Sequence, residues 1–99
     1  MMEHITAEEL QGKLESGEKL NLIDVREAEE VAQGKIPGVV HIPLGEIQVR
    51  MGELEKDKEY VLICRSGSRS SFAGSFLENQ GFKVTNMDGG MLTWTGEIE

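Results

Sequence analysis

Four short apolar runs, spaced along the chain between stretches with helical periodicity, constrain the fold of this 99-residue protein most strongly. They cover residues 20–25, 39–42, 60–63 and 82–87. Runs of this length are typical of buried strands, and strands that alternate with helices predict a parallel sheet covered on both faces. We therefore expect an α/β fold in one domain over residues 1–99, because a chain of this length holds a single core.

The stretches between these runs carry the signals of helix ends. Thr6-Ala7-Glu8-Glu9 has the form of a capping box, and Gly17 is expected to end the helix that it begins. A short helix is expected over residues 26–33. Apolar side chains at steps of three and four predict a one-sided helix over 44–54, and a further helix is expected from near Ser70 to the glycine at 81.

The charge and cysteine content exclude several classes of function. The net charge of −8, from 10 basic and 18 acidic residues, disfavours nucleic acid and anionic membrane surfaces as partners. One cysteine cannot form an internal disulfide, and one cysteine with two distant histidines gives no metal-ligand spacing, so we expect neither a metal nor another cofactor. The first residues resemble no signal peptide and no apolar run approaches membrane-spanning length, which favours a cytoplasmic protein.

The only cysteine begins a polar loop between a strand and a helix, Cys64-Arg65-Ser66-Gly67-Ser68-Arg69-Ser70. Backbone N–H groups at a helix start and two nearby guanidinium groups favour an anion, and a thiol held there should ionise readily. A buried core cysteine is the structural alternative, but these neighbours argue against it. We expect Cys64 to be the nucleophile and Arg65, Ser66, Gly67, Ser68, Arg69 and Ser70 to bind the substrate, although a helix-cap role is favoured for Ser70.

Asp24 and Arg26 lie at the end of another predicted strand, so they are expected at the same edge of the sheet as Cys64. For Asp24 we favour a structural ion pair that ties two loops together. Arg26 is expected to add to the positive potential over the site. Neither His4 nor His41 has a partner that the sequence identifies, so a Cys–His couple has little support.

Three motifs in order resemble the rhodanese homology domain in its small single-domain form. Together they cover nearly the whole chain, from Ile5 to Trp94. Val31 and Lys35 depart from residues that this family often has, an aromatic and a histidine. The motifs are Asp24-Val25-Arg26-Glu27 with Glu30 and then Gly34-Lys35-Ile36-Pro37-Gly38-Val39-Val40-His41-Ile42-Pro43, the loop Cys64 to Ser70, and Gly89-Gly90-Met91-Leu92-Thr93-Trp94.

The resemblance implies a three-layer fold with a central, mostly parallel five-stranded sheet, and sulfane-sulfur transfer with Cys64 as the sulfur acceptor. Four residues separate Cys64 from Arg69, which resembles the short active-site loop of sulfurtransferases. The corresponding loop of the related phosphatases is longer. We expect a thiosulfate sulfurtransferase that takes sulfur from a small anionic donor, thiosulfate or a small persulfide. Cyanide, an external thiol or a protein would accept it, because the chain has no second cysteine to resolve a persulfide.

Three alternatives stay open at the level of sequence. A sulfur carrier would pass persulfide from one protein to another, with little turnover of small donors. An inactive binding domain of the same fold is disfavoured by the presence of the cysteine and both loop arginines. A phosphatase is disfavoured by the short loop, which is cramped for a tetrahedral phosphate.

Overall fold

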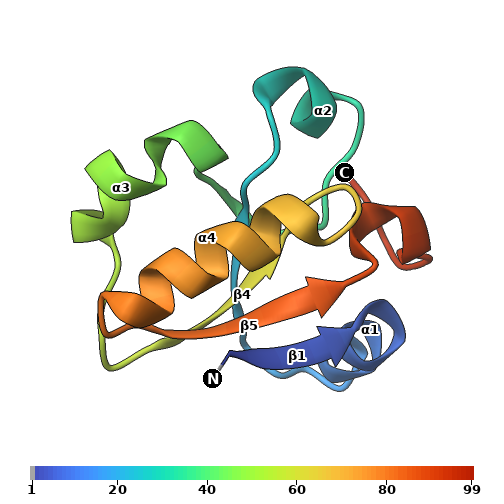
Figure 1. The fold of residues 1–99 in the computed structure, drawn as a ribbon. Helices are drawn as coiled ribbons and strands as arrows, with labels where there is room; N and C mark the ends of the chain where they lie inside the picture. The colour runs from blue at the N-terminus through green and yellow to red at the C-terminus, as the bar shows by residue number, and fades with distance from the viewer. Residues whose placement is uncertain (1) are drawn as a thin grey trace.

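A five-stranded sheet, parallel throughout, forms the centre of the molecule (Figure 1). The structure is a computed structural model that describes residues 2–99. The strand order is β1-β5-β4-β2-β3, so β4 lies in the middle. The strands are β1 (Glu3–Thr6), β2 (Asn21–Asp24), β3 (Val40–His41), β4 (Glu59–Ile63) and β5 (Lys83–Asp88).

Helices cover both faces of this sheet, which confirms the predicted α/β architecture. Alternate side chains of β4 face opposite layers, as the strand period of two requires. The helices are α1 (Ala7–Glu15), α2 (Ala28–Ala32), α3 (Ile47–Arg50) and α4 (Ser68–Asn79), with 3₁₀ turns η1 (Leu44–Glu46), η2 (Met51–Glu53) and η3 (Gly90–Thr93). Leu62 packs in one apolar cluster with residues of α4, which lies in front of β4 in Figure 1, while Ile63 packs in a second cluster with residues of α1.

The edge strand β1 is the one strand that the apolar pattern does not predict. It pairs with β5, from Glu3 opposite Thr85 to Thr6 opposite Asp88. Three of its four residues are exposed, so no buried run marks it in the sequence. No helix within residues 2–99 is long and apolar enough to cross a membrane.

Residues 44–54 do not form the single helix that their spacing predicts. They form η1, a single turn of α3, and η2 in succession. The expected apolar face is present, because Ile47 is buried and Leu44, Met51 and Leu54 pack against the same cluster. Glycines 45 and 52 fall in the two 3₁₀ turns, and each costs an α-helix about 1 kcal/mol relative to alanine.

Candidate active site

Cys64 lies directly after the central strand β4, at the carboxyl edge of the sheet where parallel α/β folds place their ligands. Its side chain is fully buried. The backbone N–H of Gly67 donates to Sγ at 3.0 Å, and the Ser70 hydroxyl lies 3.3 Å from it. Gly67 has φ +99°, and a side chain there would press within 3.1 Å of the backbone nitrogen of Gly89. The loop therefore needs glycine at this position to fold back over the sulfur.

The acidity of Cys64 reflects two opposing effects. Burial raises the pKa of the thiol, because the charged form loses water. The Ser70 hydroxyl and the backbone N–H groups of Ser70, Gly67 and Ser66 favour the thiolate, and together they lower the pKa of Cys64 below its ordinary value of 9.0. The loop thus stabilises the nucleophilic form without a neighbouring base.

The turn η3 holds the other side of the loop. The N–H groups of Met91 and Leu92 donate to the carbonyls of Cys64 and Arg65, at 2.9 and 3.0 Å. Gly90 has φ +57°, and any side chain there would collide with those same carbonyl groups. Since η3 takes up these carbonyl oxygens, the N–H groups of the loop are left to face the sulfur. This contact is the structural reason for glycine at position 90.

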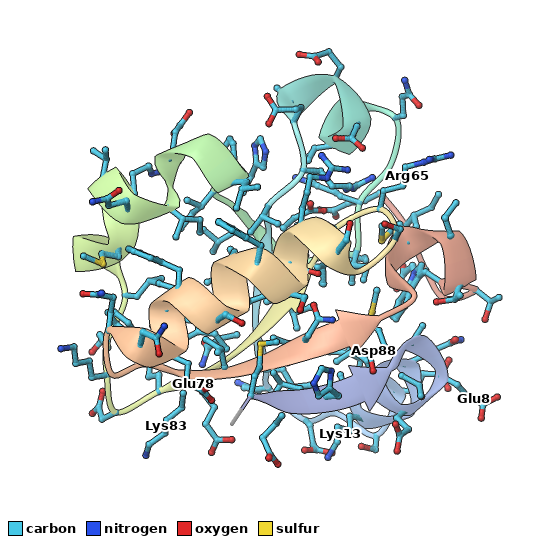
Figure 2. The ribbon with its side chains drawn as sticks, viewed as in Figure 1. Glu8, Lys13, Arg65, Glu78, Lys83 and Asp88 are labelled. Atoms are coloured by element: carbon cyan, nitrogen blue, oxygen red, sulfur yellow. The ribbon has the colours of Figure 1, made fainter. Side chains whose placement is uncertain are left out.

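Arg65 extends from the loop into solvent, as Figure 2 shows. Within residues 2–99 its side chain makes no hydrogen bond and no ion pair. It lines an open depression of about 280 Å³ together with the exposed apolar side chains of Leu92 and Ile98. Arg65 is therefore free to bind an anion that approaches the loop.

Arg69 is held in a different way. Its two terminal nitrogens donate to both carboxylate oxygens of Glu30 in α2, at 2.7 and 2.8 Å. Hydrogen bonds from Arg69 lower the pKa of Glu30 from its ordinary 4.5 to about 2. Both terminal nitrogens of the guanidinium therefore already donate to Glu30, and Arg69 can bind a substrate only if it loses at least one of these hydrogen bonds.

Asp24 and Arg26 form a buried ion pair at the end of β2. The guanidinium contacts both carboxylate oxygens, with the closest distance at 2.9 Å, and also donates to the carbonyl of Gly34 at 2.8 Å. This geometry favours the structural role expected for Asp24. The same carboxylate offsets the positive charge that Arg26 was expected to lend to the site.

The serines of the loop divide into exposed and buried positions. Ser66 and Ser68 are exposed, and their hydroxyls lie 3.3 Å apart. The expected helix-cap role of Ser70 is wrong, because α4 begins at Ser68 with Gly67 at its N-cap. Ser70 is the third residue of the helix, and its buried hydroxyl faces Cys64 instead of capping the helix.

Neither histidine lies against the thiol. His4 pairs with Asp88 at 2.8 Å, and Nε2 of His41 lies 2.6 Å from the backbone oxygen of Arg26. Within the described residues, no three His, Cys, Asp or Glu side chains are grouped so that they could hold a metal ion.

The motifs contained Glu30 and Gly90 without assigning them a role, and sequence reasoning missed Asn86 altogether. Asn86 is a buried residue of β5 whose side chain contacts the hydroxyl of Ser70 at 2.5 Å. The pairing of β5 with β4 places it opposite Leu62, two residues before Cys64. A polar residue near the end of a buried strand is the signal that could have indicated it.

Comparisons with known proteins agree with this architecture. Residues 6–97 match the model of the rhodanese-like domain. The chain is 53% identical to YtwF of Bacillus subtilis, a predicted sulfurtransferase, over 99% of this chain and 95% of YtwF. It is 49% identical to YrkF of the same organism, a predicted sulfur carrier protein, over 96% of this chain and 52% of YrkF.

A crystal structure of a rhodanese-like domain protein from Staphylococcus aureus superposes with a TM-score of 0.93 at 35% identity. The superposition covers 99% of this chain and 97% of that one. A family match over nearly the whole chain, a close relative that aligns over nearly its full length and a shared fold lead to one conclusion. This chain belongs to the rhodanese-like domain family.

Proposed function

We propose that this protein transfers sulfane sulfur in two steps through a persulfide on Cys64. The observation that carries the proposal is the buried sulfur with an N–H donor at 3.0 Å and a hydroxyl at 3.3 Å, which suits the thiolate that attacks the donor and that forms again when the sulfur leaves. Membership of a family whose relatives are named as sulfurtransferases and sulfur carriers supports the same chemistry.

In the first step the Cys64 thiolate attacks the outer sulfur of thiosulfate or of a small persulfide. A bond forms between Sγ and that sulfur, and the donor's S–S bond breaks with its electron pair leaving on sulfite or on a thiolate. Arg65 binds the anionic end of the donor, because it is the loop arginine whose guanidinium has no acid partner within residues 2–99. Arg69 contributes only when its pairing with Glu30 loosens.

In the second step an external nucleophile takes the outer sulfur, and the electron pair of the broken bond returns to Cys64. Cyanide serves in the test tube and a thiol or a protein serves in the cell. The chain has one cysteine, so it cannot release the sulfur by forming an internal disulfide. The kinetics are therefore expected to be ping-pong.

A protein-to-protein sulfur carrier is the second candidate. The predicted carrier protein YrkF shares 49% identity with this chain. Leu92 and Ile98, 62% and 56% exposed, line the depression beside Arg65, and exposed apolar side chains at a reactive site suit a protein partner better than a small anion.

Turnover of thiosulfate with cyanide tests the proposal and separates it from the carrier. We expect the wild-type protein to form thiocyanate with ping-pong kinetics and Cys64→Ser to form none. Full turnover by Cys64→Ser would overturn the persulfide mechanism. Rapid transfer from a protein persulfide together with negligible turnover of thiosulfate would favour the carrier, and hydrolysis of an aryl phosphate that depends on Cys64 would favour a phosphatase.

A further inference from the structure

The buried amide of Asn86 lies behind the thiol and has no place in the steps above. We propose that Asn86 is a positioning residue that competes with Cys64 for the single hydroxyl proton of Ser70. The geometry that points to this role is a line of contacts from Sγ to the Ser70 hydroxyl, at 3.3 Å, and from that hydroxyl to Oδ1 of Asn86, at 2.5 Å. All three residues are at most 3% exposed.

The orientation of the Asn86 amide follows from its other two contacts. Its Nδ2 lies 2.9 Å from Oδ1 of Asp88 and 3.3 Å from the carbonyl oxygen of Gly67. A carboxylate and a carbonyl only accept hydrogen bonds, so the NH₂ group must face them. The acceptor Oδ1 is therefore fixed toward Ser70.

Ser70 has one proton for three acceptors. Sγ of Cys64, the carbonyl of Gly67 and Oδ1 of Asn86 all lie within 3.3 Å of its hydroxyl oxygen. Two oxygens approach to 2.5 Å only with a proton between them, and Oδ1 has none to give. The hydroxyl therefore donates to Asn86 when the sulfur is uncharged, and it must rotate away from Asn86 in order to donate to a thiolate.

This competition makes the support from Ser70 depend on the charge of the sulfur. When Cys64 is a thiol, the hydroxyl proton of Ser70 points to Oδ1 of Asn86. When Cys64 is a thiolate, the same proton points to Sγ, and Oδ1 of Asn86 is left without this donor. If the proposed function holds, the inner sulfur of the persulfide is also uncharged. The hydroxyl would then return to Sγ as the second step breaks the bond to the outer sulfur and the electron pair collects on Cys64.

Within residues 2–99, the arginine and aspartate side chains near the thiol are already paired, with one exception. Arg69 pairs with Glu30 across α4 and α2, Arg26 pairs with Asp24 at the end of β2, and Asp88 of β5 pairs with His4 of β1. The exception is Arg65, which is exposed on the loop. None of these groups contacts the Ser70 hydroxyl, so a double-mutant cycle between positions 70 and 86 separates their effects from the competition.

The test measures the pKa of Cys64 from the ultraviolet absorbance of its thiolate, with Cys64→Ala as the blank. The single cysteine makes this signal specific, and the measurement requires no sulfur donor. We expect Asn86→Leu, which removes the acceptor but keeps the branched shape of the side chain, to lower the pKa of Cys64 by about half a unit to one unit, and Ser70→Ala to raise it by about one unit. In the Ser70→Ala background, Asn86→Leu should then have no effect.

An unchanged pKa in Asn86→Leu, or an equal shift with and without the Ser70 hydroxyl, would overturn the proposal. Asn86→Ala removes the same acceptor with less bulk and serves if the leucine variant does not fold. Thr85→Val on the same strand is the matched control and should leave the pKa unchanged. Because the readout precedes any sulfur transfer, a negative result here and a protein that forms no persulfide are separate outcomes.

Discussion

The two halves of the loop that follows β4 differ most in how their arginines are held. Arg65 and Ser66 are exposed, and Arg65 has no partner within residues 2–99. Gly67 and Ser70 are buried against the sulfur, and Arg69 is fastened to Glu30. On the proposed function, the exposed arginine of the first half binds the donor, and Gly67 and Ser70 of the second half give most of the contacts that stabilise the charge on Cys64.

The largest expected effect comes from breaking the contact between η3 and the start of the loop, on which the position of the whole loop depends. Gly90→Ala should lower the free energy of unfolding by roughly 3 kcal/mol and abolish sulfur transfer, because the methyl group collides with the carbonyls of Cys64 and Arg65 and φ is +57°. Urea unfolding and turnover with thiosulfate measure the two effects. Gly12→Ala in α1, where a methyl group meets nothing within 4 Å, is the control and should be neutral or slightly stabilising. Equal effects at both glycines would refute this account of η3.

The second effect isolates the first half of the loop. Arg65→Ala should raise the KM for thiosulfate about tenfold, since a charge-assisted hydrogen bond to the donor is lost, while the pKa of the buried thiol changes little. Steady-state kinetics and thiolate absorbance give the two numbers. A variant that retains its KM would show that the donor does not use Arg65.

A smaller effect sharpens the contrast between the two arginines. Glu30→Gln should free Arg69 and lower the KM for thiosulfate about threefold, at a cost of about 1 kcal/mol in the free energy of unfolding. Glu29→Gln is the matched control, because Glu29 is exposed and the change in net charge is the same. If both variants improve the KM equally, the gain comes from the overall charge and not from release of Arg69.

The smallest effect is the pH dependence of the same ion pair. Folding lowers the pKa of Glu30 from 4.5 to about 2, so the pair stabilises the folded state fully above about pH 4.5 and loses this contribution as the pH falls toward 2. The difference in unfolding free energy between the wild type and Glu30→Gln should therefore shrink over that interval. A difference that stays constant down to the lowest pH at which the protein folds would show that the ion pair with Arg69 does not lower the pKa of Glu30.

The central strands could be predicted from the sequence because both of their faces are buried. The run at 60–63 has no exposed position, and it became β4, whereas the mostly exposed β1 left no such pattern. The apolar face of residues 44–54 was also predictable, but the backbone that carries it was not, because glycines interrupt the helix.

Within the site, local spacing predicted that Cys64 and its loop lie at the edge of the sheet. It could not predict which arginine is free, because the partner of Arg69 lies 39 positions away in the chain. Asn86 was missed for the same reason, since its contact with Ser70 exists only once β5 packs beside β4 and α4. The parts of the site that could not be predicted are therefore those that depend on contacts between residues far apart in the chain.

Intact-protein mass spectrometry after brief exposure to thiosulfate, or to a small persulfide, tests the central claim most directly. The account predicts that the wild-type protein gains the mass of one sulfur atom, loses it on addition of cyanide or a thiol, and that Cys64→Ala gains nothing. A protein that gains no sulfur from either donor, or a Cys64→Ala variant that gains it as well, would contradict the claim that the loop holds a persulfide on Cys64.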